Sequence, residues 1–239
     1  MKHRLSMKTL VIGLIIFSAC TYVLHYLIFR DFHHIAIFFL HDVAFLPLEV
    51  LLVSVFLDRI VERTHENENR LKISMIESVF FSESGGDMLR YFISCDVESN
   101  ILCPQLKVTP QWTKTDFLAA KAFLNSYDFT VEDHKIDFFS LHYHLNKNRE
   151  LYLKMIENPA LTEHSEFTHL IMGLYHLWEE LDYHTDLYAL PEPQHQRLMG
   201  IVNSLYRLLT DEWLDNAYYL IKINSPRIEN VIRTNPFLD

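Results

Sequence analysis

Hydrophobic positions are concentrated in the first quarter of the chain. Apolar residues follow one another almost without interruption from Thr9 to Phe29, and again from Ile35 to Leu57. As a helix rising about 1.5 Å per residue, each stretch is long enough to cross a hydrocarbon core of roughly 30 Å. The pattern predicts a transmembrane hairpin over residues 1–57, with spans at about 9–29 and 35–57 and a short connection at 30–34.

The basic residues that flank these stretches predict their orientation. The connection at 30–34 holds one of them, Arg30, and the others stand before the first stretch or after the second: Lys2, Arg4, Lys8, Arg59, Arg63, Arg70 and Lys72. Cytoplasmic flanks carry an excess of Lys and Arg. We therefore expect both termini in the cytosol, with the hairpin in the inner (cytoplasmic) membrane of a prokaryote.

A cleaved lipoprotein signal is the competing interpretation of the first stretch. A basic start leads to Phe17-Ser18-Ala19-Cys20, which loosely resembles a bacterial lipoprotein processing site. The apolar residues nevertheless continue beyond Cys20 to Phe29, where a processed lipoprotein normally becomes polar. This continuation favours a span that is retained.

The second stretch carries His41, Asp42, Pro47 and Glu49 among its apolar residues. A carboxylate near the middle of a span costs about 2.5 to 3.5 kcal/mol, so these positions point to a role beyond anchoring. Asp42 and Glu49 are seven residues apart and therefore lie on nearly the same helix face. Pro47 leaves a backbone carbonyl without its helical donor and permits a kink between the two acids.

Folding the hairpin near Phe32 gives the two acids different surroundings. His25 and Tyr22 reach the depth of His41 and Asp42, so Asp42 has partners within its own chain, whereas no ionisable group of the first span reaches Glu49. Three interpretations remain: a polar contact that holds a homo-oligomer together, an ion or proton pathway, or the binding face for a partner protein.

Beyond the membrane, the sequence predicts only helices. Residues 58–86 alternate in charge, and no proline or glycine interrupts them before Gly85-Gly86, which predicts a stalk helix that loosens at Ser84–Asp87. Residues 87–239 form the predicted cytosolic domain, with a loop at 96–111 and an ending at 225–239 that is irregular or a short helix. Helical spacing and caps predict helices at 113–125, 137–158, 162–183 and 193–223. The predicted fold class is all-α, a helical bundle behind a hairpin and stalk.

Charge and cysteine usage exclude some classes of protein. The net charge is −10, and most acids follow the second apolar stretch, which opposes binding to a nucleic-acid backbone. Cys20, Cys95 and Cys103 have no CxxC spacing, which fits a reducing compartment rather than a disulfide framework.

One pattern in the predicted cytosolic domain suggests metal chemistry. His169, His176, Glu180 and His184 follow at spacings of seven, four and four, and so share one helix face. A closed zinc site needs about four ligands, so a second helix would have to contribute. The stripe lies away from the predicted buried face of Phe167, Leu170, Leu174, Leu177 and Leu181, which favours a solvated or interfacial surface over a divalent-metal site.

Three stretches of the chain resemble a known family. They are HDVAFLPLEVLLVSVFL from His41, EHSEFTHLIMGLYHLWEEL from Glu163, and EWLDNAYYLIK with VIRTNPFLD near the C-terminus. They are similar to segments of a prokaryotic family of uncharacterised two-span membrane proteins with a C-terminal helical cytosolic domain. The resemblance implies this architecture and brings no activity, cofactor or catalytic residue. The Gly85-Gly86 pair departs from the unbroken helix expected in relatives.

The motifs of common enzyme classes are missing from the sequence. There is no GxxxxGK[ST], GxGxxG, GxSxG or HExxH, and the chain has only five glycines. The sequence therefore favours a non-enzyme without a cofactor. The leading hypothesis is a homo-oligomeric, membrane-anchored scaffold or regulatory module that offers its helical domain to a cytosolic protein partner. The alternative is an oligomeric cation channel or proton-coupled pathway lined by Asp42 and Glu49.

Overall fold

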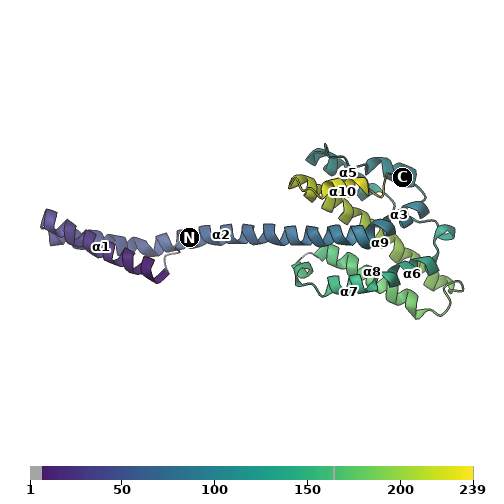
Figure 1. The fold of residues 1–239 in the computed structure, drawn as a ribbon, viewed down its shortest axis with the longest axis horizontal. Coiled ribbons are helices and arrows are strands. Elements are labelled where there is room, and N and C mark those ends of the chain that lie inside the picture. The colour runs from purple at the N-terminus through teal and green to yellow at the C-terminus, as the bar shows by residue number, and fades with distance from the viewer. Residues whose placement is uncertain (1–6, 164, 239) are drawn as a thin grey trace, which may run out of the picture. The chain divides into compact units, whose positions relative to one another are not determined.

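The structure, a computed structural model, describes residues 7–163 and 165–238 (Figure 1). It contains two compact units, Met1–His65 and Glu66–Asp239. Within the described residues every regular element is a helix, and β-pairing is limited to an isolated bridge between Asp96 and Val131. The predicted all-α fold class is confirmed.

The first unit is a pair of helices. Helix α1 (Met7–Phe29) and helix α2 (Phe32–Phe80) are joined by Arg30 and Asp31 alone, so the connection is shorter than the predicted 30–34. Arg30 adopts a positive φ of 50°, and its N–H donates to the Tyr26 carbonyl at 2.8 Å. By length and composition, both helices hold segments that are apolar enough to cross a membrane, Val11–Phe29 and a run that begins at Ile35.

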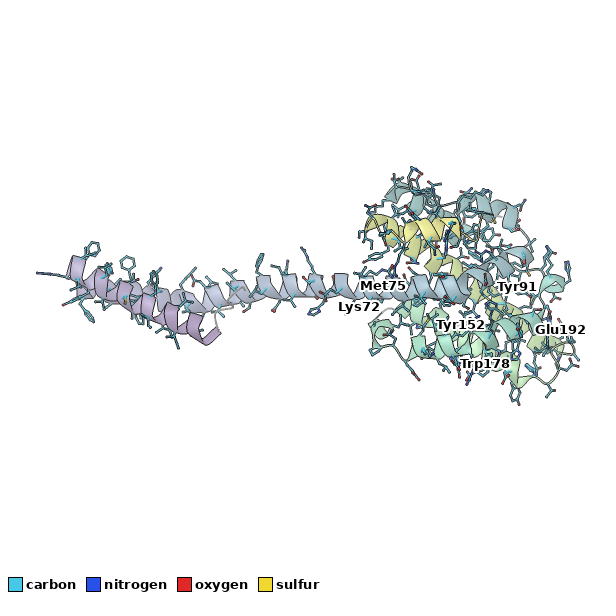
Figure 2. The ribbon with its side chains drawn as sticks, in the orientation of Figure 1. Lys72, Met75, Tyr91, Tyr152, Trp178 and Glu192 are labelled. Carbon is cyan, nitrogen blue, oxygen red and sulfur yellow. The ribbon has the colours of Figure 1, made fainter. Side chains whose placement is uncertain are left out.

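Helix α2 continues beyond the hairpin into the second unit. Its residues after His65 belong to the C-terminal unit, where Ile73 and Phe80 are buried. On its other side, Lys72 and Met75 are exposed (Figure 2). The boundary between units therefore falls at residues 65 and 66, whereas the sequence placed boundaries after residues 57 and 86. The second half of the predicted stalk is part of the core.

A π-helical turn, η1 (Phe81–Gly85), replaces the predicted loosening at Ser84–Asp87, and helix α3 (Gly86–Cys95) follows at once. A Cβ on Gly86 would lie 2.6 Å from the Phe81 carbonyl oxygen, so the wide turn requires glycine here. The Ser84 hydroxyl lies 2.7 Å from the Tyr152 hydroxyl and ties the turn to the core. Asp87 does not cap α3 but lies within it.

Two helices occupy the region after α3. Helix α4 (Ser99–Gln105) lies inside the predicted loop at 96–111. Helix α5 (Lys114–Ser126) begins as the sequence predicts, because Thr113 and Asp116 form a capping box in which the Thr113 N–H donates to the Asp116 carboxylate at 2.7 Å.

The remaining helices surround α8. The predicted helix at 137–158 is divided at Asn148 into α6 (Phe138–Lys147) and α7 (Arg149–Ile156), and the side-chain amide of Asn148 donates to the His144 carbonyl at 3.0 Å. Helix α8 (Ser165–Tyr183) contacts α6, α7 and α9 (Glu192–Lys222), and α10 (Ile228–Arg233) packs on α9. Short 3-10 turns, η2 (Asp133–Lys135) and η3 (Pro159–Glu163), precede α6 and α8.

The core of this unit follows the predicted apolar stripe of α8. Phe167, Leu170, Leu174, Leu177 and Leu181 are all fully buried. Gly173 allows α9 to approach closely, since a Cβ there would lie 2.6 Å from the Leu205 Cδ2 atom.

A buried carboxylate joins distant parts of the same unit. Asp96, which is 3% exposed, follows α3 and accepts from the hydroxyls of Tyr127 and Tyr206 at 2.7 and 2.8 Å. The Glu98 N–H donates to its other oxygen at 2.9 Å. Burial and the neighbouring Asp96 carboxylate raise the pKa of both tyrosines well above its usual range, so both remain hydrogen-bond donors.

Candidate functional sites

The acids of the hairpin lie on its surface. Asp42, Glu49 and His41 are exposed on α2, and Pro47 lies within that helix, which continues through it. Neither Asp42 nor Glu49 has a hydrogen bond or ion pair with any residue of the hairpin that the structure describes. The pairing of Asp42 with His25, His41 or Tyr22 that the sequence suggested is therefore not formed.

His25 packs against an aromatic side chain of its own helix. It is half-buried, and its ring packs edge-on against Phe29 with 4.8 Å between ring centroids. Near the same end of the hairpin, Tyr22, Tyr26 and Phe32 are among the residues that line an apolar hollow of about 420 Å³.

The His/Glu stripe of α8 borders a groove in the C-terminal unit. The groove has a volume of about 730 Å³, within the range of roughly 300 to 1,000 Å³ that is usual for ligand sites. His176, Glu180 and His184 line it, whereas His169 is exposed outside it. Helix α9 supplies the opposite wall with Gln194, Arg197, Leu198 and Ile201.

Ion pairs already engage two members of this stripe. The Arg197 guanidinium donates to the Glu180 carboxylate at 2.6 Å, and the His176 Nδ1 lies 3.0 Å from the Glu179 carboxylate. Among the described residues, no three His, Cys, Asp or Glu side chains gather in a way that could hold a metal ion. The metal hypothesis for His169, His176, Glu180 and His184 gains no support and stays a prediction.

The groove presents both charged and apolar side chains. Its lining contains imidazole, carboxylate and guanidinium groups but no Ser, Thr or Cys side chain among the described residues. Elsewhere in the unit, burial raises the pKa of the Cys95 and Cys103 thiols, which disfavours their thiolate forms.

A second group of polar side chains is buried between α2 and α9, and sequence reasoning missed it. We call it the polar seam: Arg70, Ser74 and Glu77 on α2, with Glu212 and Asn216 on α9. Ser74, Glu77, Glu212 and Asn216 are each at most 3% exposed. The Arg70 guanidinium donates to the Glu77 carboxylate at 2.8 Å, and the Ser74 hydroxyl donates to the Asn216 amide oxygen at 3.1 Å.

The carboxyl groups of the polar seam resist ionisation. Burial raises the pKa of Glu77, and the attraction of Arg70 opposes this effect. Burial, followed by repulsion from Glu77, raises the pKa of Glu212 to about 8. A signal existed in the sequence, because Arg70, Ser74 and Glu77 are spaced as one helix face and Glu212 interrupts the apolar stripe of α9.

Comparison with known proteins gives two family models and one relative. Residues 2–61 match a model described as "MJ1433, N-terminal helical domain", and residues 69–225 match "Uncharacterized protein MJ1433, C-terminal helical domain". The chain is 33% identical over 238 residues to Uncharacterized protein MJ1433 of Methanocaldococcus jannaschii. The aligned region covers 99% of this chain and 95% of the relative. No solved structure matches. The interval between the two matched ranges contains the unit boundary at residues 65 and 66.

Proposed function

This chain belongs to the MJ1433 family of proteins with N- and C-terminal helical domains, and from that premise we propose that it is a membrane-anchored scaffold or regulatory module. The hairpin inserts into the lipid bilayer and assembles copies of the chain. The C-terminal unit lies in the cytosol and binds a protein partner.

The observation that carries this proposal is the exposure of the hairpin's apolar side chains. Phe17, Leu40 and Phe56 are 71%, 70% and 66% exposed, and their neighbours along both helices are exposed as well. Soluble monomers rarely expose contiguous apolar patches larger than a few hundred Å². Lipid supplies the missing cover, and the 19 residues of Val11–Phe29 are about as many as a helix needs to cross a bilayer.

The unpaired acids support assembly through the same helices. Asp42 and Glu49 share one face of α2 and have no partner in the described hairpin. Charged groups within spans face other helices or water rather than lipid tails. Contacts between copies of the chain would remove both acids from lipid.

In the C-terminal unit, the groove between α8 and α9 is the surface that supports a partner. It combines an apolar floor of Leu177, Leu198 and Ile201 with a charged rim that includes Glu179 and Arg197. Such a mixture fits a peptide segment of a partner better than a small apolar ligand.

The proposal is tested by membrane association and by mass. The full chain should stay with the membrane after alkaline carbonate washing, and native mass spectrometry from lipid nanodiscs should show more than one copy. Asp42→Asn combined with Glu49→Gln should change the number of copies, whereas Glu68→Gln, an exposed acid of the same helix, should not. Release by carbonate would contradict the anchor, and a monomer would contradict the assembly.

One observation favours a second function, an oligomeric cation channel or proton pathway. Asp42 and Glu49 lie two helical turns apart on one face, so in a ring of copies each would form an acidic ring. Reconstituted protein would then conduct cations, and Asp42→Asn or Glu49→Gln would reduce the conductance. Conductance that is absent, or that these changes leave untouched, would exclude the channel.

A further inference from the structure

The polar seam lies entirely within the C-terminal unit, and its contacts define how α2 and α9 pair. The Arg70 guanidinium lies over the Tyr219 ring at 5.0 Å, and Ser74 is hydrogen-bonded to Asn216. Moving four residues forward along α2 therefore moves three residues back along α9, so the helices run antiparallel. One more turn places Glu77 opposite Glu212.

The seam holds more negative than positive charge. Arg70 is the cation that contacts Glu77, and it faces two buried carboxyl groups. On α9, Asp215 is paired with Lys121 of α5 at 2.6 Å, and Asp211 lies 3.8 Å from Arg207. Glu166 of α8 is exposed and adds only repulsion. With both Glu77 and Glu212 ionised, the charged groups named here would leave one buried negative charge without compensation.

The hydrogen bonds of the seam are also incomplete. Among the described buried side chains, the Oε2 atoms of Glu77 and Glu212 and the Nδ2 atom of Asn216 lack a hydrogen-bond partner. Two carboxylate oxygens cannot satisfy one another, because both are acceptors. A single proton on one of them supplies a donor and removes the excess charge at the same time.

We propose that the Glu77/Glu212 pair is a proton-binding site that holds one proton at neutral pH, on Glu212, and that release of this proton to water loosens α2 from α9. The neutral Glu212 carboxyl allows Glu77 to pair with Arg70 without a second buried negative charge nearby. Loss of the proton leaves two carboxylates opposite one another at the interface. Their repulsion is relieved when the helices separate and water enters.

This site would make the attachment of α2 sensitive to pH. Helix α2 also contains the second apolar stretch of the hairpin, so the helix that the polar seam holds is the same helix that continues into the hairpin. The proton-binding site does not rest on the proposed membrane role, because all its groups lie after residue 65.

The direct test is infrared difference spectroscopy of the full chain in lipid nanodiscs. Wild type should lose one protonated-carboxyl band as pH rises, with a midpoint near the Glu212 pKa of about 8. Glu212→Gln should lack this band, and Glu68→Gln, which removes an equal charge from the surface of α2, should retain it. No band in wild type, or an unchanged band in Glu212→Gln, would overturn the proposal.

Three further results decide the same question. Glu77→Gln removes the repelling carboxylate, so the midpoint should fall by about one pH unit or more; an unchanged midpoint would refute the pairing. Glu212→Gln resembles the protonated form and should fold; failure to fold would contradict the assignment. A midpoint that falls strongly when Ca²⁺ is added would show a cation in place of the proton and overturn the proposal.

Hydrogen exchange tests the loosening of α2. After correction for the intrinsic pH dependence of exchange, the amides of residues 73–80 should exchange at least about tenfold faster above the titration midpoint than below it in wild type. In Glu212→Gln the two rates should be equal. Equal exchange rates above and below the midpoint in wild type would show that release of the proton does not loosen α2.

Discussion

The hairpin and the C-terminal unit use the same apolar residue types in opposite ways. Helix α1 exposes its apolar side chains from Val11 to Phe29, whereas α8 buries one stripe and leaves its other described side chains half-buried or exposed. Phe17 of α1 is 71% exposed and Leu174 of α8 is fully buried. The difference is that the C-terminal unit covers its apolar side chains with its own residues, whereas the described apolar side chains of the hairpin are left uncovered, which is why we propose a lipid bilayer around them.

Acidic residues differ between the two units in the same way. Asp42 and Glu49 lie on the hairpin surface without a partner among the described residues. In the C-terminal unit, Asp96 is buried among hydrogen-bond donors, and Glu77 is buried against Arg70. Substitutions at matched positions in the two units can break or sharpen this contrast, and tryptophan fluorescence reports the C-terminal unit, because Trp112, Trp178 and Trp213 all lie there.

The largest effect is expected at Asp96. Asp96→Ala leaves two buried tyrosine hydroxyls and a backbone N–H without their acceptor, and should lower the free energy of unfolding by about 4 kcal/mol. Asp42→Ala, which removes an exposed acid of the hairpin, should change it by less than about 0.5 kcal/mol. Denaturant titrations in detergent measure both, and equal effects would contradict the contrast.

Leucine truncation should give the next largest difference. Leu174→Ala creates a cavity in a fully buried position and should cost about 3 kcal/mol in the same titration. Leu40→Ala removes a side chain that is 70% exposed. The free energy of unfolding of the C-terminal unit should then stay within about 0.5 kcal/mol of the wild-type value. A large effect of Leu40→Ala would show that the hairpin packs into the core.

Replacing two glycines by alanine should change the free energy of unfolding in opposite directions. Gly86→Ala places a Cβ against the Phe81 carbonyl of the π-helical turn and should destabilise the unit by about 2 kcal/mol. Gly200→Ala, on an exposed face of α9 with nothing within 4 Å of the new Cβ, should stabilise it by about 0.5 to 1 kcal/mol. Destabilisation by both changes would show that the turn has no special requirement for glycine.

The smallest effect concerns His144. Burial lowers its pKa below the ordinary value of 6.5, so the unfolded chain binds a proton on this residue more readily than the folded chain does. Stability from this group is therefore lost as pH falls below about 6.5. The stability of wild type relative to His144→Gln should decline between about pH 7.5 and pH 5.5. A difference in stability that stays constant with pH would contradict this assignment. His41→Gln is the control, because His41 lies outside the unit whose unfolding the tryptophan fluorescence reports.

Apolar periodicity predicted much of this fold from the sequence. The hairpin helices, the caps of α5 and the buried face of α8 follow local spacing, and the structure has them close to the predicted bounds. The π-helical turn is held by the tertiary contact of Ser84 with Tyr152, which no local pattern contains. The break at Asn148 and the short α4 were not predicted either. The two compact units meet at residues 65 and 66 rather than after 57 and 86, because Ile73 and Glu77 are buried in the C-terminal unit although charged residues surround them in the sequence.

The candidate sites were less predictable than the fold. The sequence placed His176, Glu180 and His184 on one face, and the structure adds that Arg197 of α9, seventeen residues after Glu180 in the chain, forms an ion pair with Glu180. The polar seam joins residues of α2 and α9 that are 142 positions apart in the case of Ser74 and Asn216. Such pairs require the packing of both helices to be known.

Cysteine accessibility tests the membrane-spanning hairpin most directly. In a chain whose native Cys20, Cys95 and Cys103 are replaced by alanine, Asp31→Cys in the turn and Glu68→Cys after the hairpin are treated with a membrane-impermeant maleimide. Spheroplasts should show labelling at Asp31→Cys, whereas Glu68→Cys should react only after lysis. Equal labelling of both positions before lysis would contradict a hairpin that crosses the membrane.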